Sequence, residues 1–282
     1  MNPTAMAWRA GWSRGLIELR QSLTNAGDLV NHFFWPSLML ITLFFLRDVS
    51  FGQSGFSLGT LVMPSILGMN AAMSMISMSQ QLTADREDGT LLRAKATPNG
   101  MVGYLLGKIV SVSGGLLVDL AIFLVPGMFL VSGLAIGDPG SWLTLSWVLA
   151  LGLVATLPIG AVLGSVFVSV RSQGLLTLPM LGMIAISGIF YPLTVLPEWV
   201  QWIAQAFPIY WLGLGMRSAL LPGGAAAVEI GESWRHLETI GVLGAWAVLG
   251  LLLAPIVLRR MARRESGSSV AERREKALQR IG

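Results

Sequence analysis

Long apolar runs are the feature of this sequence that most limits its fold. A helix needs roughly 20 apolar residues to cross a bilayer core about 30 Å thick. Six runs of about that length or longer occur, at residues 29–46, 58–80, 101–131, 142–170, 174–191 and 240–258. Hydrophobic residues make up 54% of the chain and charged residues only 12%. The sequence therefore predicts an all-α polytopic membrane protein with six transmembrane helices.

A further apolar stretch, residues 193–221, is not expected to cross the membrane. Pro197, Pro208 and Pro222 interrupt it, so it cannot form one continuous helix. The stretch also contains aromatic side chains, which prefer the membrane interface: Trp199, Trp202, Phe207, Tyr210 and Trp211. Two short re-entrant helices that dip into the outer leaflet between spans 5 and 6 would satisfy both constraints.

Lysine and arginine are distributed unevenly around the predicted spans. Positively charged loops stay in the cytoplasm, and placing both termini there puts 16 of the 19 lysines and arginines on that side. They are Arg9, Arg14, Arg20, Arg86, Arg93, Lys95, Lys108, Arg171, Arg259, Arg260, Arg263, Arg264, Arg273, Arg274, Lys276 and Arg280. We therefore expect a multi-pass protein of the cell membrane with both termini cytoplasmic. Its net charge of +4 then reflects topology and contact with membrane lipids, and not binding of nucleic acid.

The two ends of the chain differ from the six-span region, residues 28–260. Within residues 1–27, an apolar stripe at helical spacing predicts an amphipathic helix at the cytoplasmic interface, formed by Trp8, Trp12, Leu16, Leu19 and Leu23. This helix either contacts a partner or serves only as a topology anchor. Residues 261–282 predict a basic cytoplasmic tail that holds anionic lipid.

The loop between the second and third runs is highly charged and has the pattern of a short helix. Acidic residues come first, where a helix dipole favours them, and Arg93 and Lys95 follow. Leu91 and Leu92 provide an apolar edge, and the sequence Pro98-Asn99-Gly100 ends the segment. Two interpretations remain open, a docking helix for a partner and a solvated connector against the headgroups.

Within the spans, a few side chains suggest a transport pathway. Asp119 is an acid in the middle of a run, which is costly and makes a functional role the default hypothesis. Ser111, Ser113 or a partner protomer could instead satisfy it. Met69 and Met73 belong to a methionine-rich second span that either accepts varied apolar substrates or fills packing gaps.

Two motifs resemble those of a known family, the permeases of type 2 ABC exporters, of which the daunorubicin-resistance group is an example. The first comprises Asp85-Arg86-Glu87, Gly89-Thr90, Leu91, Thr97-Pro98 and Gly107-Lys108. The second comprises Tyr191-Pro192, Leu196-Pro197, Trp199, Phe207-Pro208 and Arg217. The resemblance covers roughly residues 5–260.

The resemblance implies a permease that exports a hydrophobic or amphipathic substrate, such as a drug, an antibiotic or a lipid. It implies a second protomer, identical or related, and two separate ABC ATPase subunits that use ATP and magnesium. Coupling to the ATPase would involve Asp85, Arg86, Glu87, Asp88, Gly89, Thr90, Leu91 and Leu92. The extracellular gate would involve Tyr191, Pro192, Trp199, Trp202 and Phe207.

The chain itself is expected to bind no cofactor or metal and to catalyse no reaction. It has no cysteine and only two histidines, His32 and His236. Residues 103–109 have the wrong spacing for a nucleotide-binding loop and lack its Ser or Thr. The alternative function is a proton-coupled secondary transporter that uses Asp119.

Overall fold

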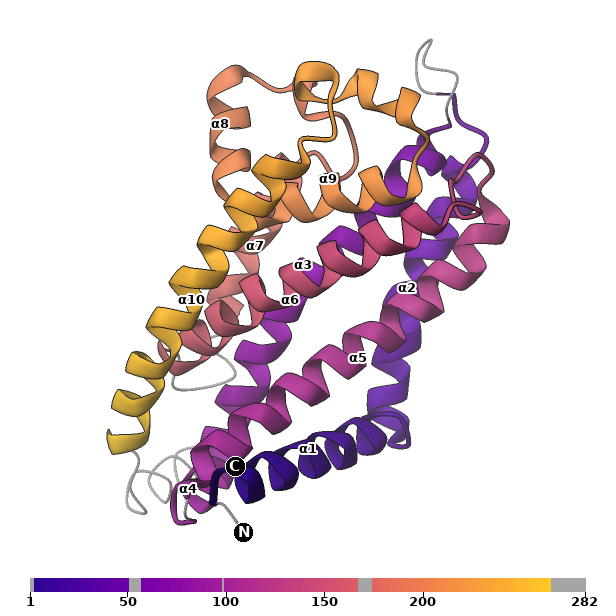
Figure 1. The fold of residues 1–282 in the computed structure, drawn as a ribbon. Coiled ribbons are helices and arrows are strands. Elements are labelled where there is room, and N and C mark those ends of the chain that lie inside the picture. The colour runs from indigo at the N-terminus through magenta and orange to yellow at the C-terminus, as the bar shows by residue number, and fades with distance from the viewer. Residues whose placement is uncertain (1–2, 51–56, 98, 167–173, 265–282) are drawn as a thin grey trace, which may run out of the picture.

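The computed structural model describes residues 3–50, 57–97, 99–166 and 174–264, and it shows a bundle of helices (Figure 1). In chain order the helices are α1 (Pro3–Ser22), α2 (Ala26–Leu46), α3 (Leu58–Glu87), α4 (Thr90–Lys95), α5 (Gly100–Leu130), α6 (Pro139–Val166), α7 (Gly174–Ile186), α8 (Glu198–Ala206), α9 (Pro208–Leu220) and α10 (His236–Arg264). The described residues also form short 3-10 helices, which are η2 (Leu193–Val195), η3 (Gly223–Val228) and η4 (Ile230–Glu232). These residues contain no β-strand, so the predicted all-α class is confirmed.

Five of the predicted spans correspond to helices that are long and apolar enough to cross a membrane. They are α2, α3, α5, α6 and α10. Side-chain caps begin two of these helices. Asn25 accepts a hydrogen bond from the Gly27 N–H before α2, and Ser57 accepts one from the Thr60 N–H before α3.

The remaining predicted span, residues 174–191, corresponds to α7. This helix has 13 residues, which is roughly 20 Å at about 1.5 Å per residue and is short of a bilayer core. Residues 167–173 before it lie outside the described part of the chain. The count of six spans therefore stays a prediction.

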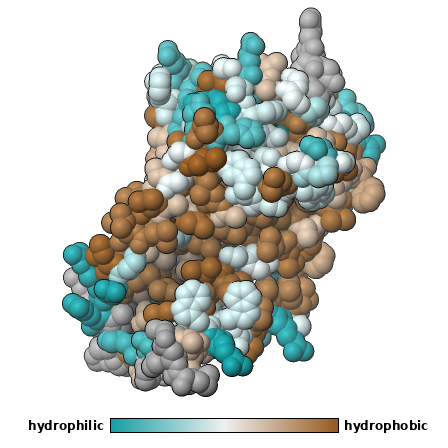
Figure 2. All heavy atoms as spheres, in the orientation of Figure 1, coloured by the Kyte–Doolittle hydropathy of each residue, from teal (hydrophilic) through white to brown (hydrophobic). Residues whose placement is uncertain are grey.

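The helices run between two ends of the molecule, which we call the α4 end and the α9 end. Figure 1 shows α1, α4 and the C-terminal end of α10 at one end, and α8 and α9 at the other. Between the ends lies a broad apolar surface flanked by hydrophilic surface, as Figure 2 shows for one face. Such a belt is what lipid tails require of a membrane protein.

Helix α3 is the centre of the bundle. Most of its apolar segment is buried, and it packs against α5, α6 and α9. Glycines allow these close approaches, because a Cβ on Gly68 would lie 2.6 Å from the backbone of Gly213 in α9. A Cβ on Gly164 of α6 would likewise lie 2.7 Å from the Ser79 carbonyl oxygen. Lipid tails are as apolar as the helix surfaces, so helices in a membrane associate through close packing, which small residues at the contacts allow.

Helices α8 and α9 are two short helices separated at Phe207-Pro208, in agreement with the proline argument. Their re-entry into a leaflet stays a prediction. The aromatic residues of the two helices have different environments. Tyr210 and Trp211 of α9 are 0% and 2% exposed, whereas Trp199 and Trp202 of α8 are 67% and 68% exposed. The expectation that all of these rings lie at the membrane interface is therefore not met for α9, because α9 packs between α3, α6 and α10.

Candidate functional site

The predicted coupling segment, residues 85–92, is divided between the end of α3 and the start of α4, and it does not form one short helix. Asp85 and Glu87 do not begin the short helix; they lie in the last turn of α3, and α4 contains only Thr90–Lys95. Gly89, with φ of 79°, adopts the left-handed conformation that separates the two helices. The Asp88 carboxylate, outside the helix, accepts a hydrogen bond of 2.7 Å from the Thr90 N–H. Asp88 thus stabilises the start of α4, where the helix dipole favours a negative charge.

The apolar side of α4 faces the protein itself. Leu91 is 1% exposed and packs with Leu82 of α3, Tyr104 of α5 and Leu258 of α10, while Leu92 is half-buried. Leu91 therefore anchors the short helix to the bundle. The Arg86 guanidinium, also buried, donates a hydrogen bond of 3.0 Å to the Ser165 carbonyl oxygen at the end of α6.

A network of charges joins three helices at the α4 end. The Lys108 ammonium of α5 lies 2.9 Å from an Asp85 oxygen of α3 and 3.0 Å from a Glu18 oxygen of α1. The Tyr104 hydroxyl donates to Asp85 at 2.7 Å, and Arg14 pairs with Glu18 at 2.9 Å. In the sequence, Lys108 was noted as a cytoplasmic charge and as part of a motif, but not as a partner of Asp85 and Glu18. The sequence did contain a signal for these contacts, because Arg14 with Glu18 and Tyr104 with Lys108 have the i, i+4 spacing that makes residues neighbours on a helix.

The charge network sets the ionisation of Glu18. Burial alone would raise the pKa of this carboxyl group, but the neighbouring Lys108 and Arg14 cations together outweigh burial and hold the pKa below its ordinary value of 4.5. Glu18 is therefore ionised at neutral pH and holds Lys108 on the α1 side.

Helix α1 contacts α5 through glycine and not through its tryptophans. A Cβ on Gly11 would lie 2.5 Å from the Gly103 carbonyl oxygen, and one on Gly15 would lie 2.6 Å from that of Gly107. The tryptophans of the predicted apolar stripe face outward instead, with Trp8 and Trp12 more than half exposed, whereas Leu19 of the same stripe lies against Gly114 of α5. Outward tryptophans suit a helix that lies between the bundle and the headgroups.

A groove of about 450 Å³ lies between α1 and the α4–α5 turn. Its walls include Met6 and Arg14 from α1 and Ala94 and Thr97 from the region of α4. The predicted interfacial helix and the predicted coupling helix therefore share one surface at the α4 end.

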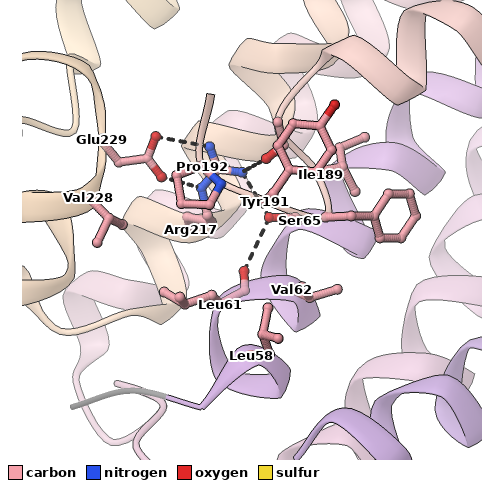
Figure 3. Close-up of a pocket in the computed structure, with 12 residues that line it drawn as sticks. Leu58, Leu61, Val62, Ser65, Ile189, Tyr191, Pro192, Arg217, Val228 and Glu229 are labelled. Atoms are coloured by element: carbon pink, nitrogen blue, oxygen red, sulfur yellow. Dashed lines mark hydrogen bonds and ion pairs between the residues drawn. The ribbon is translucent and has the colours of Figure 1, made fainter. Parts of the chain in front are cut away.

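At the α9 end, a buried ion pair closes the bundle (Figure 3). The Arg217 guanidinium of α9 meets the Glu229 carboxylate with distances of 2.6 and 3.2 Å, and both side chains are less than 5% exposed. Arg217 also donates to the Ser65 hydroxyl of α3 at 2.8 Å and to the Gly188 carbonyl oxygen at 3.3 Å. The sequence motif included Arg217, but Glu229 was missed because no local pattern links the two.

The predicted gate residues separate into different places. Tyr191 and Pro192 line a cavity of about 20 Å³ beside Arg217, room for about one water (Figure 3). The Tyr191 hydroxyl donates to the Ala185 carbonyl oxygen. Phe207 stacks against Trp246 of α10, with ring centroids 5.9 Å apart. Trp199 and Trp202 lie on the exposed side of α8 and do not line this cavity.

The predicted pathway residues do not form one site, because Met69 and Met73 are not among the residues that line the cavity containing Asp119. Met69 and Met73 are half-buried and pack against the main apolar core. Asp119 of α5 meets neither Ser111 nor Ser113. Its carboxylate lies 2.5 Å from Nδ1 of His32 in α2. Among the described residues, no group of three or more acidic, histidine or cysteine side chains could hold a metal ion.

The sequence was also compared with known proteins. No individually curated protein matches it. A family model described as "ABC-2 family transporter protein" matches residues 41–256, which include every helix from α3 to α9 and most of α10. Because the match covers well over half of the chain and agrees with the helical, membrane-type architecture, this protein belongs to the ABC-2 transporter family.

Proposed function

We propose that this permease works in an ATP-driven exporter whose separate ATPase subunits dock on the α4 end. The observation that carries the proposal is the charge network of Lys108, Asp85 and Glu18, which ties the end of α3 to α1 and α5. Because Leu91 also fixes α4 to α10, a displacement of this short helix would act on several long helices together. The groove shared by α1 and α4 offers the docking surface.

The proposed orientation puts the α4 end in the cytoplasm of a cell membrane, with both termini on that side. Arg259, Arg260 and Arg263 near the end of α10 support it, because positive charge stays inside. Six crossings fit this orientation. Helix α6 runs toward the α4 end and α8 lies at the α9 end, so the chain between them must travel back along the molecule (Figure 1).

The proposed complex contains two permease protomers and two ATPase subunits, which use ATP and magnesium. The exposure of α2 supports a second protomer, since only Pro36 and Leu43 of this 21-residue helix are buried. A partner helix or lipid must cover the rest. The proposed substrate is hydrophobic or amphipathic, and Tyr191, Pro192 and Phe207 are proposed to act at the extracellular gate.

The test is to tag the chain in its native cell, extract it in mild detergent and ask whether a nucleotide-binding ATPase co-purifies in equal amount. Glu87→Arg at the α4 end should reduce ATPase recovery and transport. Glu198→Arg makes the same charge change on an exposed residue at the other end and should leave both unchanged. Equal recovery for both variants would refute docking at the α4 end.

A second candidate, proton-coupled transport, is favoured by one observation. The ionisable pair of His32 and Asp119 joins two membrane helices. If no ATPase co-purifies and transport follows the proton gradient and fails in Asp119→Asn, this candidate replaces the first.

A further inference from the structure

A polar cavity lies where the end of α1 meets α2, α3 and α5. Its volume is about 480 Å³, and its polar lining includes Asp28, Asn31, Gln80 and Gln81 in addition to His32 and Asp119. Asn31 and Gln80 are exposed although their helices belong to the apolar bundle. Amides and carboxylates do not face lipid tails, so this surface faces water or a polar ligand.

The charge of the lining is negative. No lysine or arginine is among the described residues that line the cavity, whereas Asp28 and Asp119 are. Asp28 lies in the first turn of α2, where the helix dipole already favours an acid, so it is the less informative of the two. Asp119, which lies far from both ends of the long apolar helix α5, has no such explanation.

The geometry of Asp119 leaves one of its oxygens available. Oδ1 meets Nδ1 of His32, and Nε2 of the same ring lies 3.4 Å from the Ser22 hydroxyl. A carboxylate only accepts, so Nδ1 carries the proton in this contact, and a neutral ring leaves the pair with one negative charge. Within the described chain no donor reaches Oδ2, and the Asp119 side chain is 33% exposed. His32 therefore orients the carboxylate toward the cavity.

The apolar part of the lining completes a site for a cation with a hydrophobic body. Trp35 contributes an indole ring, which attracts organic cations through its π face, and Leu116 and Val112 contribute aliphatic surface. We infer that this cavity binds the cationic head of an amphiphilic substrate, with Asp119 as the charge partner and Trp35 as the ring beside it. This inference rests on the proposed export function and names the substrate class.

Helix α1 connects the cavity to the charge network at the α4 end. Ser22, the last residue of α1, lies in its wall, and α1 carries Glu18 of the charge network. A shift of α1 on ATPase docking would therefore reach the wall of the binding site directly.

The experiment measures binding of tritiated tetraphenylphosphonium to the full chain in phosphatidylcholine nanodiscs, with protein-free nanodiscs as background. Triphenylphosphine oxide is the matched competitor, because it carries phenyl groups on phosphorus and has no net charge. We expect saturable binding of the cation that excess unlabelled cation abolishes and the neutral compound does not. Absence of saturable binding, or equal competition by the neutral compound, would overturn the inference.

Variants locate the site. Asp119→Asn keeps an acceptor for His32 and removes the charge, and it should weaken cation binding at least about tenfold, the equivalent of about 1.4 kcal/mol. Asp119→Glu should retain most of the affinity. Asp138→Asn removes an exposed acid from the loop before α6 and should have no effect. Unchanged binding in Asp119→Asn would contradict the assignment.

If Asp119→Asn does not fold, Trp35→Leu provides the second test, because Trp35 is exposed and lines the same cavity. It should weaken binding severalfold, and wild-type affinity in this variant would contradict the site. ATPase co-purification is measured on the same samples. Cation binding without the ATPase would refute the proposed function alone, and the ATPase without cation binding would refute this inference alone.

Discussion

Both ends of this permease contain a cation held by carboxylates, but the two arrangements differ in exposure and in connectivity. At the α9 end, Arg217 and Glu229 are sealed from solvent and lie twelve residues apart in one segment, with Ser65 as the link to α3. At the α4 end, Lys108 is shared by two acids from two other helices, and the Glu18 side chain is 22% exposed.

The difference indicates different mechanical roles. A sealed, bidentate pair cannot be broken without leaving a buried charge, so it holds the turn after α9 against α3 in one position. A cation with two partly accessible acids can lose one contact and keep the other. The α4 end is therefore the better place for helices to move relative to one another.

The largest expected effect follows from breaking the sealed pair. Arg217→Met leaves the Glu229 carboxylate buried without a cation and should reduce the free energy of unfolding by about 3–5 kcal/mol. Denaturant titration in detergent measures it. The double variant Arg217→Met/Glu229→Leu removes both charges and should recover most of the loss; a double variant as unstable as the single one would contradict this account.

A smaller effect is expected at the shared cation. Lys108→Met leaves Asp85 with the Tyr104 hydroxyl and Glu18 with Arg14, so the loss should be about 1–3 kcal/mol. The same denaturant titration measures this loss of unfolding free energy. Transport per folded protein should also fall, because Lys108 connects the α4 end to α1. A cost equal to that of Arg217→Met would remove the contrast between the ends.

The glycine contact between α1 and α5 tests how firmly α1 is held at the α4 end. Gly11→Ala places a methyl group against the Gly103 backbone and should destabilise the protein by about 1–3 kcal/mol. Gly244→Ala is the matched control within α10, since nothing lies within 4 Å of its added Cβ. It should be neutral or slightly stabilising. Equal effects for the two variants would show that α1 does not depend on this close approach.

The smallest effect concerns pH. The pKa of Glu18 is below its ordinary value of 4.5, so this group contributes stability that is complete above about pH 4.5 and is lost as the pH falls through the lowered value. Unfolding should be compared between wild type and Glu18→Gln across that range. The difference between them should shrink in acid, and a constant difference would contradict ionisation of Glu18 as its cause.

The sequence predicted the parts of this protein that depend on local rules. Apolar length predicted the helical membrane class and five of the helices that are long and apolar enough to cross a membrane, and Pro197 and Pro208 predicted that the region after α7 forms short helices. Asp85 and Glu87 were assigned to the wrong helix. In the structure α3 continues through Glu87, because a helix boundary depends on the left-handed turn at Gly89 and on the burial of Leu82 and Leu91 behind it.

Hydrophobic length, proline breaks and charge asymmetry are properties of neighbouring residues, so the sequence by itself determined the class of protein and most of the helices that are long and apolar enough to cross a membrane. Partner choice was decided only by the tertiary structure. His32 meets Asp119, Glu229 meets Arg217, and Lys108 joins α1 to α3. Tyr210 is an aromatic residue of the kind expected at an interface, yet it lies in the core. The physical reason is that burial and ion pairing depend on which helix faces which, and helix packing creates those neighbours across long separations in the chain.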